Sequence, residues 1–74
     1  MDHPRISQNP NVMFGKPVIR GTRITVELIL RRLSEGWSED MILDGYPHLE
    51  REDIRAAEAF AADYLASIRT VAAE

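Results

Sequence analysis

Three expected helix starts in the chain share one sequence pattern, and this pattern limits the possible folds most strongly. Thr25, Ser38 and Glu50 each stand just before an expected helix, where a side-chain oxygen can accept a hydrogen bond from the first turn. An apolar residue before each cap can pack on the fourth helical residue as a hydrophobic staple. The pairs are Ile24 and Ile29, Trp37 and Ile42, and Leu49 and Ile54.

These signals predict helices over residues 26–35, 39–44 and 51 to about 71. Gly36 and Gly45 stand where the first two helices end, because glycine accepts the left-handed conformation at a helix C-terminus without steric cost. A helix that ends near residue 71 is about 30 Å long. Two short helices cannot cover that length, so we expect its far end to project or to meet another chain.

The region before the helices, residues 5–24, has a β and turn character. Short strands are expected at 5–7 and 18–20, and the glycines Gly15 and Gly21 mark turns, with a positive φ expected at Gly21. The sequence therefore predicts a mainly α fold in a single domain, residues 1–74. The fold is a trihelical, homeodomain-like helix-turn-helix bundle with a short N-terminal β segment.

The composition limits the functions that such a chain can have. A chain of 74 residues has a small core and marginal stability, and with no cysteine it has neither a disulfide nor a zinc–thiolate site. It contains no His-Glu-x-x-His motif and no phosphate-binding loop, and its acidic pairs stand at helix starts, where the helix dipole explains them. We therefore expect no enzyme activity, no cofactor and no metal. An apolar membrane span and a signal core are also lacking, which favours a cytoplasmic protein.

The net charge of −3 is divided unevenly along the chain, with about +3 on residues 1–36 and −6 on residues 37–74. The candidate DNA-binding residues are therefore Lys16, Arg20 and Arg23, because Arg51 and Arg55 of the last helix stand among acids that repel phosphates. The alternative is that these three cations are simply solvated and that the neighbouring glycines serve only the turns.

Several strings resemble the small bacterial and archaeal family known as domain of unknown function 433. They are Asn9-Pro10, residues 15–23 (Gly-Lys-Pro-Val-Ile-Arg-Gly-Thr-Arg), Gly36-Trp37-Ser38, residues 46–49 (Tyr-Pro-His-Leu) and residues 52–54 (Glu-Asp-Ile). The resemblance runs from about Ile6 to Tyr64. The chain differs at two positions: Phe14 stands where the family often has a glycine, and Glu50 where it usually has Thr or Ser, so the third cap is expected to be weaker.

The resemblance implies a homeodomain-like fold and the role of an antitoxin whose partner is a PIN-like ribonuclease toxin. We expect the partner to bind the acidic last helix through apolar anchors, and the candidates are Phe60, Tyr64, Leu65 and Ile68. Two alternatives remain open: a stand-alone DNA-binding helix-turn-helix regulator and an oligomerisation module. DNA binding by the chain alone is expected to be weak.

A homodimer is predicted, because edge strands and an overlong helix both favour association with a second copy. Such pairing would bury Ile6, Val18 or Ile19 at one end, or Leu65 and Ile68 at the other. Sedimentation at micromolar protein concentration should show twice the chain mass of 8.4 kDa. A species of single-chain mass under these conditions would contradict the prediction.

Overall fold

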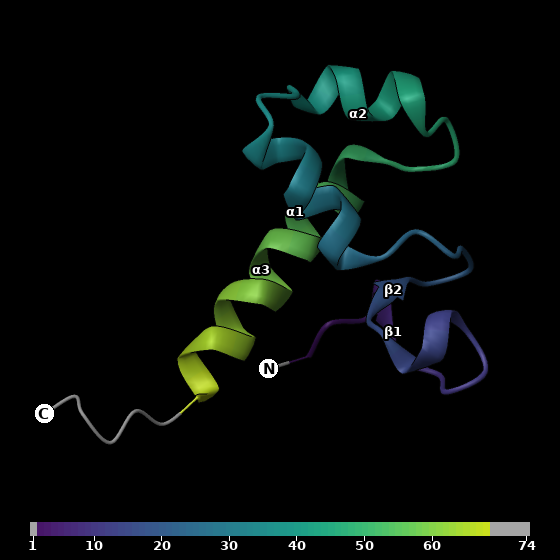
Figure 1. Cartoon of the computed structure of the whole chain (residues 1–74), viewed down its shortest axis with the longest axis vertical. Coiled ribbons are helices and arrows are strands. Elements are labelled where there is room, and N and C mark those ends of the chain that lie inside the picture. Colours follow the sequence, from purple (N-terminus) through teal and green to yellow (C-terminus); the bar gives the residue numbers. More distant parts are fainter. Residues whose placement is uncertain (1, 69–74) are drawn as a thin grey trace, which may run out of the picture.

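Three helices and a two-stranded hairpin make up the residues, 2–68, that this computed structural model describes (Figure 1). The elements follow in the order β1 (Ile6–Ser7), the short 3-10 turn η1 (Met13–Gly15), β2 (Val18–Ile19), α1 (Val26–Ser34), α2 (Glu39–Gly45) and α3 (Arg51–Ser67). This architecture confirms the predicted trihelical fold with an N-terminal β segment. No helix within residues 2–68 is both long and apolar enough to cross a membrane.

The first two helices begin at the predicted caps. The Thr25 hydroxyl accepts a hydrogen bond of 2.9 Å from the Leu28 N–H, and the Ser38 hydroxyl accepts one of 3.1 Å from the Met41 N–H. Each bond satisfies one of the backbone donors that a helix N-terminus leaves free. The six staple residues all belong to one apolar cluster, in which Ile29, Ile42 and Ile54 are almost fully buried.

The third helix begins at the predicted residue with Glu50 as its N-cap, and Asp53 forms a capping box with it. The buried carboxylate of Asp53 accepts a hydrogen bond of 2.9 Å from the Glu50 N–H, and the Asp53 N–H donates to the Glu50 carbonyl at 2.9 Å. Asp53 also accepts a bond of 2.9 Å from the Arg5 guanidinium. A carboxylate in the first turn also suits the positive end of the helix dipole. This helix start therefore depends on Asp53, where the sequence suggested a weak cap at Glu50.

The hairpin pairs β1 with β2 in an antiparallel register that sets Ile6 opposite Ile19. Both isoleucines are buried, and β1 packs against α3. The Arg20 guanidinium returns across the hairpin and donates to the carbonyls of Pro4 and Ile6 at 2.8 and 3.0 Å. A two-stranded hairpin is barely stable by itself, so this side chain and the helices hold it in place.

Two features at the ends of helices differ from the prediction. Helix α3 ends at Ser67, and Ile68, its C-cap, is extended at φ −77° and ψ 122°, so the helix stops short of residue 71. Residues 69–71 of the predicted helix lie outside the described residues. Gly45 is the last residue of α2 and does not have a positive φ.

Gly45 packs against the corner between α1 and α2. A Cβ atom there would lie 3.4 Å from the Trp37 ring. Tyr46 also turns toward this corner: its ring centroid lies 6.5 Å from that of Trp37, and its hydroxyl accepts a bond of 3.4 Å from Arg32.

Gly21 has the predicted left-handed conformation, with φ +80°, between β2 and α1. A Cβ atom at this position would meet nothing within 4 Å, so the penalty of a side chain comes from the backbone alone. We expect Gly21→Ala to lower the free energy of unfolding by about 1 kcal/mol or more. Gly21→Asn should lose less, because asparagine tolerates this region. Denaturant unfolding measures both, and equal stability of the alanine variant and wild type would contradict the argument.

Candidate protein-binding groove

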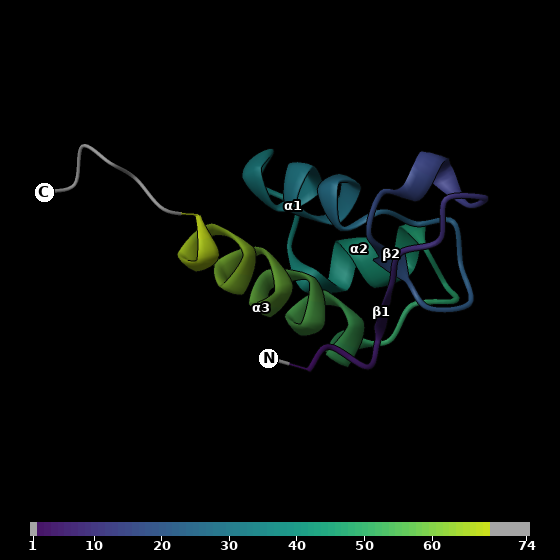
Figure 2. The ribbon, with the colours of Figure 1, turned by 90° about the horizontal axis from the view of Figure 1, so that it is seen from below.

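An open groove runs between α1 and the last turns of α3. It forms because α3 has 17 residues and α1 only nine, so that α3 continues past the end of its neighbour. Figures 1 and 2 both show the C-terminal end of α3 extending away from the other elements. The groove has a volume of about 500 Å³ and is lined by Lys16, Pro17, Val26, Glu27, Leu30, Arg31, Ser34, Phe60, Ala61, Tyr64 and Leu65.

The groove brings together three of the four residues that the sequence suggested for partner binding. Phe60, Tyr64 and Leu65 all line it, while Ile68 lies beyond them at the helix end. The side chains of Tyr64 and Leu65 remain 60% and 65% exposed, and Ile68 50%. Neighbouring large apolar side chains that stay exposed mark a surface suited to contact with another molecule. The expectation that the far end of α3 projects is therefore confirmed.

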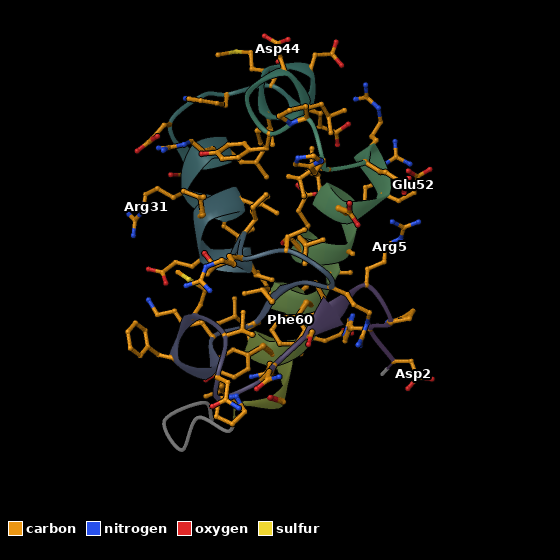
Figure 3. All side chains as sticks on the ribbon, turned by 90° about the vertical axis from the view of Figure 1, so that its right-hand side faces the viewer. Asp2, Arg5, Arg31, Asp44, Glu52 and Phe60 are labelled. Carbon is orange, nitrogen blue, oxygen red and sulfur yellow. The ribbon has the colours of Figure 1, made fainter. Side chains whose placement is uncertain are left out.

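Aromatic contacts fix one wall of the groove. The rings of Phe60 and Tyr64 are stacked with centroids 6.5 Å apart, and His3 meets Phe60 edge to face at 5.2 Å. The Nε2 atom of His3 also lies 2.9 Å from an Asp63 carboxylate oxygen. The N-terminal segment therefore lies along α3 and contacts Phe60. Figure 3 shows Phe60 on α3, near the hairpin.

The opposite rim is charged. Lys16 donates a hydrogen bond of 3.0 Å to Glu27, and this bond, more than any other contact, lowers the pKa of the Glu27 carboxyl below its ordinary value. Arg31 stands one turn further along α1 and points outward, away from the side where Arg5 lies (Figure 3). Lys16, Glu27 and Arg31 also line a second hollow of about 320 Å³, together with Met13, Arg23, Thr25 and Leu28. The two hollows therefore share one rim.

The three cations suggested for DNA binding do not act as one group. Lys16 and Arg23 line the second hollow, and Arg31 joins them there. The Arg20 guanidinium is instead bound to the hairpin carbonyls described above. Arg31 was not among the DNA-binding residues predicted from the sequence. Its spacing of four residues from Glu27, which places both on one helix face, was a usable signal.

Phe14 is 95% exposed and was not among the binding residues predicted from the sequence, where it stood out only as a difference from the family. It lies in η1 with a φ of +59°, in the left-handed region that favours glycine. The available signal was an aromatic residue in an expected turn, directly before Gly15.

The acids and arginines at the starts of α2 and α3 pair with each other. Arg51 bonds to Glu39 at 2.7 Å and to Asp40 at 2.6 Å, which joins the two helix starts. Arg5 bonds to Glu50 at 3.0 Å in addition to Asp53. Among residues 2–68, no group of three or more His, Asp or Glu side chains is placed to hold a metal ion. The ion pairs of Arg51 therefore connect α2 to α3, and those of Arg5 connect the N-terminal segment to α3.

The comparisons with known proteins agree with one another. A family model described as "Protein of unknown function (DUF433)" matches residues 6–61. The "Uncharacterized protein y4eO" of Sinorhizobium fredii (strain NBRC 101917 / NGR234) is 34% identical over 56 residues, which are 76% of this chain and 25% of that protein. A crystal structure of a DUF433 member protein from Anabaena variabilis ATCC 29413 has 32% identity and a TM-score of 0.77, and the match covers 80% of this chain and 58% of that one. The chain thus spans a quarter of the first relative and little more than half of the second.

Proposed function

This chain belongs to the DUF433 family, and on that premise we propose that it is an antitoxin that binds and neutralises a PIN-like ribonuclease encoded beside it. The observation that carries the proposal is the apolar groove between α1 and α3, where Tyr64 and Leu65 stay more than half exposed. Exposed aromatic and aliphatic side chains beside a groove are typical anchors of a protein interface.

The size of the chain supports this role. Its buried core consists of nine apolar side chains among the described residues. A core of this size gives only a small free energy of unfolding. A partner that binds only the folded state adds stability that increases with the logarithm of its concentration once this exceeds the dissociation constant. When the partner is scarce, the unbound chain unfolds more often and is open to proteolysis. Release of the ribonuclease would follow from that loss.

Replacing both Tyr64 and Leu65 with alanine should weaken binding to the ribonuclease by at least about tenfold, since anchors of this kind dominate interface energies. Both side chains are exposed, so the melting temperature of the free protein should change little. Binding is measured by calorimetry and neutralisation by growth of cells that express the ribonuclease. Met41→Ala is the matched control, because Met41 is also half exposed but lies on α2. Full neutralisation by the double variant would place the interface elsewhere.

A second candidate function is repression of the protein's own promoter. Lys16, Arg23 and Arg31 line one hollow, and a dimer without the ribonuclease would present these cations twice to the DNA backbone. The start of α3 offers less, because Glu39 and Asp40 already hold Arg51.

For this second function, Lys16→Ala combined with Arg23→Ala should lower the slope of log affinity against log salt by about one unit for each lost phosphate contact. Arg51→Ala combined with Arg55→Ala should change the slope less. Arg20 is left intact in both, because it holds the hairpin. Titration of the native promoter at two salt concentrations compares the two variants. A larger effect of the second pair would identify α3 as the reading helix.

A further inference from the structure

The turn between the two strands holds an exposed phenylalanine in an unfavourable backbone conformation. Met13, Phe14 and Gly15 follow one another with φ values of +49°, +59° and +82°. Hydrogen bonds fix this turn: the Gly15 N–H donates to the Val12 carbonyl at 3.0 Å, and the Lys16 N–H donates to the Met13 carbonyl at 3.1 Å. The Phe14 side chain is 95% exposed.

Folding of the chain does not account for a phenylalanine at this position. A ring that stays in water contributes nothing to the core, and the left-handed backbone brings the Cβ atom of an L-residue too close to the following carbonyl. Glycine takes the same conformation without that clash. Strained residues persist where the surrounding structure fixes them, and they are concentrated at binding sites and switch regions. The turn thus presents the ring outward in one defined position.

The charges beside the turn indicate what the ring would meet. Met13 lines the same hollow as Arg23 and Arg31. Neither arginine side chain has an ion pair or side-chain hydrogen bond within residues 2–68, whereas Lys16 is already bonded to Glu27. This hollow shares its rim with the groove between α1 and α3. One continuous surface therefore leads from the exposed end of α3 across α1 to the turn.

We propose that Phe14 is a second anchor for the protein partner, inserting its ring into an apolar pocket whose rim carries carboxylates that pair with Arg23 and Arg31. This inference rests on the proposed function and extends its interface to the other side of α1. A protein surface fits better than a nucleic acid, because the surface continues into an apolar groove and the chain carries a net charge of −3, which repels a polyanion.

The test compares Phe14→Gly with wild type in two measurements. The free variant should melt a few degrees higher, because glycine relieves the strained backbone. Its affinity for the PIN-like ribonuclease should nevertheless fall by about tenfold or more. Met41→Ala again serves as the control and should leave the affinity unchanged. Arg23→Glu combined with Arg31→Glu should also weaken the complex, and more strongly at low salt than at high salt.

Each other outcome is decisive. An unchanged affinity of Phe14→Gly, with binding lost on replacement of Tyr64 and Leu65, overturns this inference alone. A lower melting temperature of Phe14→Gly also overturns it, because the strained backbone on which the inference rests would then not be relieved by glycine. A wild-type chain that does not bind the ribonuclease overturns the proposed function and this inference together. Binding of a single-stranded oligonucleotide that Phe14→Gly abolishes, with the ribonuclease affinity retained, would assign the ring to nucleic acid instead.

Discussion

The bond between Arg5 and Asp53 joins the N-terminal segment to the start of the last helix, and through it the hairpin is connected to the helical bundle. Asp53 is buried, caps α3 through the Glu50 N–H, and accepts the Arg5 guanidinium at 2.9 Å. The strand that follows Arg5 is thereby fixed against the start of α3. Because β1 pairs with β2, and β2 leads through a tight turn into α1, this carboxylate links the hairpin to α3 beside the apolar core that the elements share.

The groove lies at the opposite end of α3 from that bond. The N-terminal turns of α3 are packed among the other elements, where Ile54 and Ala57 are buried. The C-terminal turns extend beyond α1 because α3 is the longer helix, and Tyr64 and Leu65 stay exposed there. Exposed apolar side chains of this kind suit contact with another molecule.

The features that the sequence predicts well are local ones. The caps at Thr25 and Ser38, the two strands and the positive φ of Gly21 each follow from a few neighbouring residues. The projection of Tyr64 and Leu65 beyond the other helices follows from a long last helix, which the sequence predicts, although that helix ends at Ser67 and not near residue 71. The bond from Arg5 to Asp53 spans 48 positions, and the shared rim of the two hollows depends on how the hairpin packs against α1, so neither could be inferred from spacing. The sequence predicted a left-handed Gly45 at the end of the second helix. Its packing against Trp37 could not be inferred, because it depends on the positions of the two helices.

The corner between α1 and α2 gives the molecule a built-in optical probe. Trp37 is the only tryptophan of the chain, and the Arg32 guanidinium lies over its ring at 5.0 Å, in a contact that holds only while the corner is folded. The residues that line the groove include neither side chain. Fluorescence of this one indole therefore follows the folding of the bundle in the unlabelled protein, at a place apart from the groove.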